Sequence, residues 1–310
     1  MKKSIALVAM AFGVSSAFAQ DLTSKKGEPI LPEAGDYMIG IDANPFLNYL
    51  GNFFGKTNNN VAPSFNFMNG NNMIVGKYFK DAKTAYRVGI RIGLDNQTTK
   101  KQTVDQSVTT APVYPNLPTY SDDKLVHNKT NIGLTVGIEK RKGKTRLQGF
   151  YGADLMLWVS SAKDSYTYGQ TLDPNGSIAG LQAVTAANSS NFGSNLNTGL
   201  LGGATSGRTL SSRTGNGFGF GLRAFIGAEY FVLPKISIGG EFGWGVGYMT
   251  GGKTTTVIES IGTSGTATSK NEISQTVKNG GHFVLDTDLN NSSTGSLLAP
   301  SASLRINLHF

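Results

Sequence analysis

The residue types that most often carry catalysis are scarce in this 310-residue sequence, which contains three histidines and no cysteine. His127 lies close to Asp122 and Asp123, and an imidazole beside carboxylates is an arrangement that a hydrolase would use. A nucleophile elbow also needs the spacing Gly-x-Ser-x-Gly, which neither Gly193-Ser194 nor Gly295-Ser296 satisfies. The pattern therefore favours a histidine in contact with solvent over a catalytic one.

The segment that follows His282 contains the other candidate for ligand chemistry. The run from Asp286 through Asp288 to Asn290 begins as a calcium-binding loop does, and both acids lie near the histidine. A complete loop needs a glycine next and a later glutamate, but residue 291 is Asn, which leaves at most a weak surface site. The glycine-rich runs at 217–221 and 243–247 lack the spacing of a phosphate loop. We therefore predict no catalytic residue, no resident metal and no cofactor.

Those glycine-rich runs instead belong to segments that alternate at every second position, the pattern of a sheet with two unlike faces. In Phe218–Tyr230 and Ile236–Tyr248, large apolar residues alternate mainly with glycine, Arg and Glu. Six further segments alternate in the same way: Tyr37–Asn44, Asn72–Phe79, Ala85–Asp95, Asn131–Lys140, Arg146–Ser160 and Ser301–Phe310. The total is about eight strands, each near the roughly 9–11 residues that a tilted membrane strand requires.

The connections between these strands alternate between very short and very long. Tight turns are expected at Lys80–Thr84, Arg141–Thr145 and Val232–Lys235. Long polar loops are expected at Phe46–Asn71, Asn96–Thr130, Ser161–Asn216 and Met249–Pro300. Short turns at one rim and long loops at the other are the layout of an outer-membrane barrel, with the turns in the periplasm. The loops are rich in Asn, Ser, Thr and Gly, and such loops suit contact with ligands, glycans or partner proteins.

Residues 1–19 have the pattern of a secretory signal peptide. Lys2 and Lys3 precede an apolar core at Ile5–Val14, and Ala17-Phe18-Ala19 forms a cleavage site. Its removal takes two lysines from a formal net charge of +8 and leaves +6. The remaining basic residues are scattered, whereas a nucleic-acid partner would require them to cluster. No run of about 18 apolar residues follows, so the mature chain can span a membrane only as a closed barrel.

The C-terminal segment completes a pattern that resembles a known family. Leu304, Ile306, Leu308 and Phe310 alternate up to a terminal aromatic residue. With the signal peptide, the strands, the short turns and the long loops, the chain resembles the small outer-membrane β-barrel proteins related to the membrane domain of outer-membrane protein A. The resemblance implies that Ser303–Phe310 is the signal read by the barrel-assembly machinery.

Strand alternation turns a set of charged residues toward the barrel interior if the large apolar face meets lipid. An eight-stranded barrel is only wide enough for its own side chains, and an isolated charge there is costly, so acids and bases should pair. The predicted lumen cluster is Asp42, Arg87, Arg91, Asp95, Glu139, Asp154, Arg223, Glu229, Glu241 and Arg305. It is either a salt-bridge plug or a gated path for ions or solutes, and the narrow interior favours the plug.

A short amphipathic helix is predicted to begin at Pro45 and to continue to Gly55. Its apolar residues are Phe46, Leu47, Tyr49, Leu50, Phe53 and Phe54. Because it follows the first strand, it should lie at the outer rim. Three placements remain open: on the lipid interface, folded into the barrel mouth, or docked on another membrane protein.

The sequence therefore predicts an all-β protein, a transmembrane antiparallel up-and-down barrel of about eight strands. The expected organisation is a signal peptide at 1–19, a periplasmic segment at 20–35 and an outer-membrane barrel at 36–310. We expect a non-enzymatic structural or surface-recognition protein, or an accessory subunit of a larger outer-membrane complex, with loops exposed at the surface of a Gram-negative cell. The alternative is a narrow porin or a conduit for small or apolar solutes. Expected partners are membrane lipid, lipopolysaccharide, the assembly machinery and another outer-membrane protein, and no nucleic acid is expected.

Overall fold

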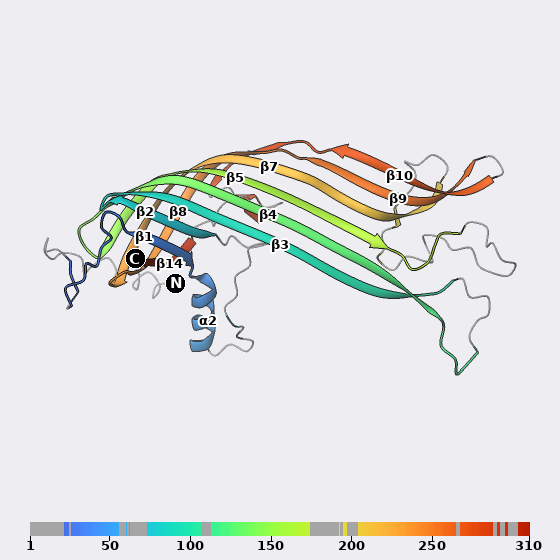
Figure 1. Ribbon diagram of the computed structural model, residues 1–310, viewed down its shortest axis with the longest axis horizontal. Coiled ribbons are helices and arrows are strands. Elements are labelled where there is room, and N and C mark those ends of the chain that lie inside the picture. The colour runs from blue at the N-terminus through green and yellow to red at the C-terminus, as the bar shows by residue number, and fades with distance from the viewer. Residues whose placement is uncertain are drawn as a thin grey trace.

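In the computed structural model, the described part of the chain consists almost entirely of antiparallel strands and one short helix (Figure 1). It describes residues 22–24, 26–55, 60, 62, 73–106, 113–173, 192, 195–196, 204–264, 267–287, 290–291, 295–296 and 303–310. The predicted signal peptide lies outside the described residues. Among those residues, no helix is both long and apolar enough to cross a membrane.

Backbone pairing closes eight of the strands into a ring. In order around the ring they are β1 (Tyr37–Asp42), β2 (Ile74–Asp81), β3 (Thr84–Val104), β4 (Tyr120–Lys142), β5 (Leu147–Thr167), β7 (Ala204–Leu233), β8 (Ile236–Met249) and β14 (Ser303–His309). The ring closes because β7 pairs with β8, β8 with β14, and β14 with β1. These are the eight segments whose alternation predicts strands, so that prediction is confirmed.

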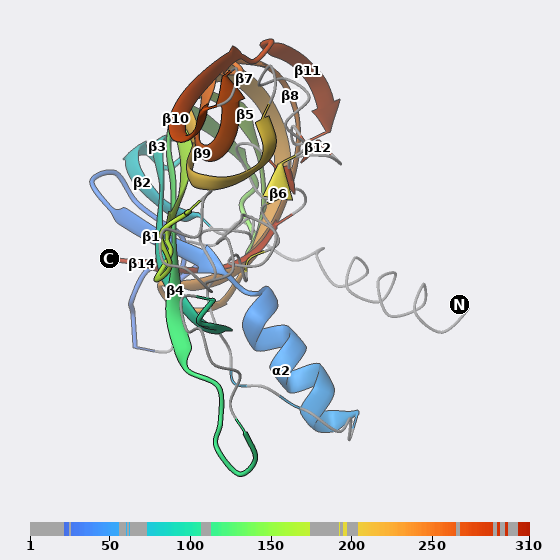
Figure 2. The ribbon, with the colours of Figure 1, turned by 90° about the vertical axis from the view of Figure 1, so that its right-hand side faces the viewer.

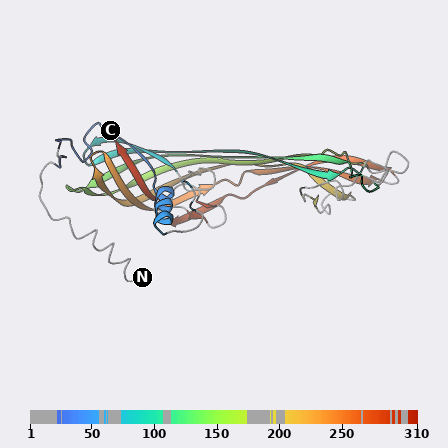
Figure 3. The same cartoon turned by 90° about the horizontal axis from the view of Figure 1, so that it is seen from below.

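Four of the ring strands continue far beyond their neighbours and form a second region, which we call the extension sheet. It comprises the ends of β3, β4, β5 and β7 remote from the tight turns, together with β9 (Lys253–Ser264) and β10 (Ala267–Lys278), in the order β10-β9-β7-β5-β4-β3. Strand β7 pairs with β8 over Gly219–Leu233 and with β9 over Ala204–Thr214. Figures 1 and 3 show a long, narrow, curved sheet that projects from one end of the ring.

The extension sheet corrects the prediction of long polar loops. Much of Asn96–Thr130, Ser161–Asn216 and Met249–Pro300 forms paired strands rather than loops. Apolar alternation is absent there because both faces of the extension are polar, yet threonine-rich segments favour a pleated backbone. Within the expected loop Ser161–Asn216, residues 174–191, 193–194 and 197–203 lie outside the described residues, and the part from Ala204 belongs to β7.

Smaller elements complete the described chain. Strand β11 (His282–Thr287) pairs with the end of β8 that β14 leaves uncovered. Strand β6 (Asn195–Leu196) pairs with β7, and β12 (Asn290–Asn291) pairs with β13 (Gly295–Ser296). Helix α2 (Asn44–Phe54) follows β1 and projects to one side of the strands (Figures 1 and 2). The predicted helix is thus confirmed to within one residue at each end.

The described residues between Leu22 and Asp36 fold back against the turn end of the ring. Ile30 is buried and its backbone N–H donates to Leu22, while the N–H of Gly35 donates to Phe79 of β2 at 2.8 Å. Asp36 accepts a 2.7 Å hydrogen bond from Lys235, in the turn between β7 and β8. Burial raises the pKa of Asp36, but the hydrogen bonds and the charge of Lys235 outweigh it, so the pKa lies below its usual value.

Candidate functional site

The outward face of the ring is an apolar belt with aromatic borders. Alternate residues of β3 from Tyr86 to Leu94 and of β5 from Tyr151 to Leu157 point outward, and the large ones are between 37% and 69% exposed. From Tyr86 to Leu94 the chain advances eight residues, which is about 26 Å along the strand at the usual spacing. The border at the tight turns consists of Tyr37, Tyr78, Tyr86, Tyr151, Tyr230 and Phe310. The border toward the extension sheet contains Phe218, Phe220 and Tyr248.

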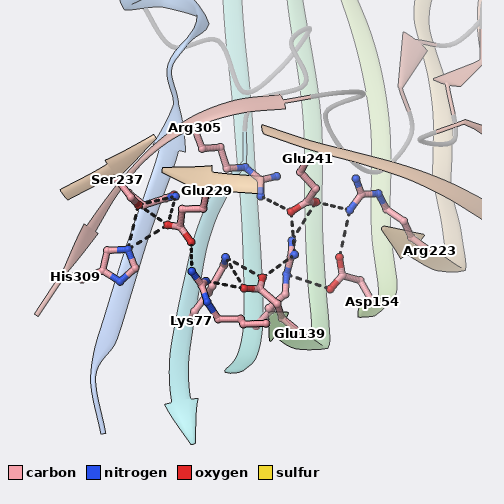
Figure 4. Close-up of polar contacts among 12 residues, drawn as sticks. Lys77, Glu139, Asp154, Arg223, Glu229, Ser237, Glu241, Arg305 and His309 are labelled. Atoms are coloured by element: carbon pink, nitrogen blue, oxygen red, sulfur yellow. Dashed lines mark hydrogen bonds and ion pairs between the residues drawn. The ribbon is translucent and has the colours of Figure 1, made fainter. Parts of the chain in front are cut away.

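The interior of the ring holds a buried polar cluster, which we call the lumen network (Figure 4). Every ring strand except β1 contributes to it, and each of its members is at most 6% exposed. Its members are Lys77, Arg87, Glu139, Arg141, Asp154, Arg223, Glu229, Ser237, Glu241, Arg305, Asn307 and His309.

Glu241 of β8 accepts hydrogen bonds from three guanidinium groups. Arg87 of β3 donates through Nη1 at 2.9 Å and Nη2 at 3.2 Å, which is a bidentate contact. Arg223 of β7 donates through Nη1 at 2.6 Å, and Arg305 of β14 through Nη1 at 3.3 Å. One carboxylate therefore ties together strands from opposite parts of the ring.

Two further carboxylates continue the network across β4 and β5. Glu139 contacts Lys77 at 2.8 Å, Arg141 at 2.9 Å and Arg87 at 3.3 Å. Asp154 lies 3.4 Å from both Arg87 Nε and Arg223 Nη1. Arg87 thus bridges all three carboxylates and lies at the centre of the network.

The fourth carboxylate, Glu229, lies toward the turn end with a serine and a histidine beside it. Arg141 Nη2 and Asn307 Nδ2 donate to Glu229 at 2.6 and 2.7 Å, and Ser237 Oγ also donates to it. His309 Nε2 lies 3.2 Å from both Ser237 Oγ and a Glu229 oxygen. A hydrolytic triad places the acid on the other ring nitrogen and leaves the serine accessible, whereas Ser237 is 0% exposed. The geometry of these contacts therefore differs from that of a hydrolytic triad.

Aromatic rings fill the space between these charges. Arg87 Cζ lies 3.9 Å from the centroid of Phe225, and Lys77 Nζ lies 4.7 Å from that of Phe150. The ring of His309 contacts Phe79 and Phe231 at centroid distances of 5.6 and 5.0 Å. Arg141 and Arg223 also lie over aromatic rings, so four of the five cations of the network, Lys77, Arg87, Arg141 and Arg223, have both a carboxylate and a π face near them, which lowers the cost of their burial.

The formal charges of the lumen network nearly cancel. It has the cations Lys77, Arg87, Arg141, Arg223 and Arg305 and the anions Glu139, Asp154, Glu229 and Glu241, with His309 counted as neutral. A buried charge is tolerated when it is paired and its hydrogen bonds are satisfied. The contacts therefore form a cross-linked layer that occupies the ring interior.

The structure brings most of the predicted lumen cluster together. Seven predicted residues belong to the network: Arg87, Glu139, Asp154, Arg223, Glu229, Glu241 and Arg305. Arg91 is buried four residues after Arg87 in β3, and Asp42 is half-buried at the end of β1, in register with Arg305. Asp95 was predicted wrongly, since it is exposed on the extension sheet. Alternation predicts which face of a strand a side chain occupies. It does not predict where the neighbouring strands end, and so it does not show that Asp95 lies beyond the ring.

Sequence reasoning missed several members of the network. Lys77 lies in the strand whose start, Met73-Ile74-Val75, is apolar at consecutive positions and so hides the alternation. Arg141 was predicted to begin a tight turn, but β4 continues to Lys142 and turns Arg141 inward. Arg141 lies two residues after Glu139, and this spacing could have predicted that the two side chains share the inward face of β4.

The other candidates from the sequence lie apart from the network. His127 was predicted in a loop but lies in β4, where Nδ1 is 2.5 Å from Asp164 Oδ1 rather than beside Asp122 and Asp123. His282 begins β11, and residues 288 and 289 of the calcium-like run lie outside the described residues. Within the described part of the chain, no group of three or more His, Asp or Glu residues is placed to hold a metal ion.

The predicted assembly signal and the predicted helix both keep apolar surface exposed. Leu308 and Phe310 are 49% and 62% exposed, and Leu304 and Ile306 share their face of β14. On α2, Phe53 and Phe54 are 62% and 77% exposed, and Leu47, Tyr49 and Leu50 are exposed as well, while Phe46 is half-buried.

Comparisons with known proteins show a distant structural likeness. No family model and no curated protein matches the sequence. Among solved structures, the chain is similar to the crystal structure of the outer membrane protein OprG from Pseudomonas aeruginosa. The likeness covers 90% of this chain and 98% of that one, with 10% sequence identity and a TM-score of 0.26. At that score the likeness carries no argument.

Proposed function

We propose that the ring is a β-barrel of the Gram-negative outer membrane, with its tight turns in the periplasm and the extension sheet outside the cell. The observation that carries this proposal is the apolar belt. Along β3 it covers the nine residues Tyr86–Leu94, which is within the roughly 9–11 residues that a tilted membrane strand requires, and both of its borders are aromatic. In water, a continuous belt of this kind would be an aggregation site.

We further propose that the barrel does not conduct ions or solutes. Its proposed role is structural or in surface recognition rather than enzymatic. The lumen network supports a closed interior, because its charges contact one another instead of lining a space. The alternative, a narrow porin or solute conduit, would require this cross-linked layer to separate.

The extension sheet supports a recognition or accessory role. Beyond the belt, β3 continues from Asp95 to Val104, which corresponds to roughly 33 Å of strand. An anchor alone does not need paired strands of this length, whereas a projecting sheet offers a rigid surface to a ligand or to another outer-membrane protein. The terminal strand is proposed as the signal to the barrel-assembly machinery.

Planar-bilayer recordings test the closed interior. The reconstituted wild-type protein should give no steady openings. Steady wild-type openings that disappear in Glu241→Gln or Arg223→Gln would overturn the proposal in favour of the conduit.

The accessory role can be tested by removing the β9–β10 hairpin. The N–H of Asn279 donates to Gly252 O at 3.1 Å, so the two ends of the hairpin lie side by side. A short Gly-Ser turn can therefore replace Lys253–Lys278. A protein that co-purifies with the full chain in mild detergent should be lost from this variant, while the ring stays folded. Unchanged co-purification would refute a role for the hairpin.

A further inference from the structure

The turn end of the ring carries a group of exposed lysines just beyond the apolar belt. They are Lys80, Lys83, Lys140, Lys142 and Lys144. Lys140 follows Ile138 at the same alternation of β4, and Ile138 belongs to the belt, so Lys140 lies on the outward wall of the ring and not in its lumen.

A shallow hollow of about 600 Å³ lies on this wall between the β2–β3 turn and the end of β4. Thr84, Lys140 and Tyr151 are in register across β3, β4 and β5, and all three line it. Lys140 Nζ donates to Thr84 Oγ1 at 2.8 Å, which fixes the ammonium group beside the hollow. Tyr151 is 56% exposed and belongs to the aromatic border of the belt.

The charge of the hollow is positive. Lys83 and Lys140 line it together with one carboxylate, that of Asp81. Asp81 Oδ1 accepts the backbone N–H of Lys83 at 2.7 Å, and the carboxylate also interacts with Thr84 and with the charge of Lys140, so the two lysines and this one acid leave a net positive charge. Arg141 also lines the hollow, but its guanidinium nitrogens bond Glu139 and Glu229 inside the ring.

We propose that this hollow binds the phosphate headgroup of an anionic phospholipid such as phosphatidylglycerol, an inference that rests on the membrane location proposed above. The hollow adjoins the aromatic border of the belt, which is the level at which lipid headgroups lie. A lysine at this level can place its stem along apolar surface while its ammonium reaches a phosphate. Tyr151 supplies a hydroxyl at the same level, and the belt above holds the acyl chains.

The test compares lipid preference between two double variants of the full-length protein, each reconstituted in vesicles of phosphatidylcholine with and without phosphatidylglycerol. Lys83→Gln with Lys140→Gln removes two charges from the hollow. Lys100→Gln with Lys124→Gln removes two exposed charges that face each other across β3 and β4 on the extension sheet. Native mass spectrometry after mild detergent extraction measures the phosphatidylglycerol that stays bound.

Each lysine near an anionic surface contributes about a fivefold change in binding, so the hollow variant should retain phosphatidylglycerol about 30-fold less well, with the control unchanged. Equal loss in both variants, or no preference of the wild type for phosphatidylglycerol, would overturn the site. Inorganic phosphate that displaces the lipid completely, where chloride at matched ionic strength does not, would also overturn it by making phosphate alone the ligand. The membrane proposal fails separately, and this site with it, if protease digests the ring strands in both kinds of vesicle.

Discussion

Replacing Glu241 with glutamine is the sharpest test of the lumen network, because this carboxylate accepts from Arg87, Arg223 and Arg305 at 2.6–3.3 Å. Glutamine keeps the size of the side chain but removes its charge. Breaking a buried ion pair from one side costs about 3–5 kcal/mol, since the partner is left charged and unpaired. With three arginines affected, we expect a loss of unfolding free energy near the upper end of that range.

The measurement is denaturant unfolding of the reconstituted protein, followed by the change in midpoint at constant slope. Glu272→Gln on β10 is the matched control, because Glu272 is exposed and its replacement should change stability by less than about 0.5 kcal/mol. Adding Arg305→Gln to Glu241→Gln removes one unpaired cation, so the double variant should recover part of the loss. A loss below about 1 kcal/mol for Glu241→Gln, or a double variant that is less stable still, would refute the reasoning.

Three further predictions concern other contacts. A Cβ on Gly219 would overlap the buried indole of Trp158, so Gly219→Ala should lower the unfolding free energy by about 1–3 kcal/mol, measured by denaturant unfolding. Gly51 lies on α2 with open space around it, so the control Gly51→Ala should not destabilise the protein. Because the pKa of Asp36 is lower in the folded protein than in the unfolded chain, its stabilising contribution is complete above about pH 4 and is lost as the pH falls through the folded pKa. Asp36→Asn should abolish this part of the pH dependence of the unfolding free energy between about pH 6 and 3. If the unfolding free energies of the variant and the wild type changed in parallel over this range, the prediction would be contradicted. Asp164→Asn should cost less than about 1 kcal/mol, since His127 and Asp164 are 38% and 34% exposed, and a loss as large as that of Glu241→Gln would contradict the contrast between exposed and buried pairs.

Alternation predicted the ring because each of its strands separates an apolar outer face from a polar inner one. The same rule failed for the extension sheet, where Thr98 and Thr99 lie in the part of β3 beyond its apolar face and Thr254 and Thr256 lie in the threonine-rich start of β9. The charged partners of the network were predictable as a set, but their pairings were not, because Arg87 and Glu241 are 154 residues apart and meet only when the ring closes.

His127 illustrates the same limit at a smaller scale. Its neighbours in sequence, Asp122 and Asp123, were the natural candidates, but the register of β4 with β5 places Asp164 opposite it. Register depends on the pairing of whole strands, so a contact of this kind cannot be read from local spacing.

Strand β7 makes the two regions of the molecule mechanically continuous. It runs for 30 residues, carries Arg223 and Glu229 of the lumen network and pairs with β9 at its far end. A force applied along the strands at the tip would load its ladder of hydrogen bonds in shear, and the ion pairs inside the ring would resist the sliding of β7 past its neighbours. A sideways force would instead bend the sheet near the irregularity between Ser160 and Ala162, where the β5–β7 register shifts. We therefore expect the extension sheet to be stiff under tension and to bend more easily in one direction.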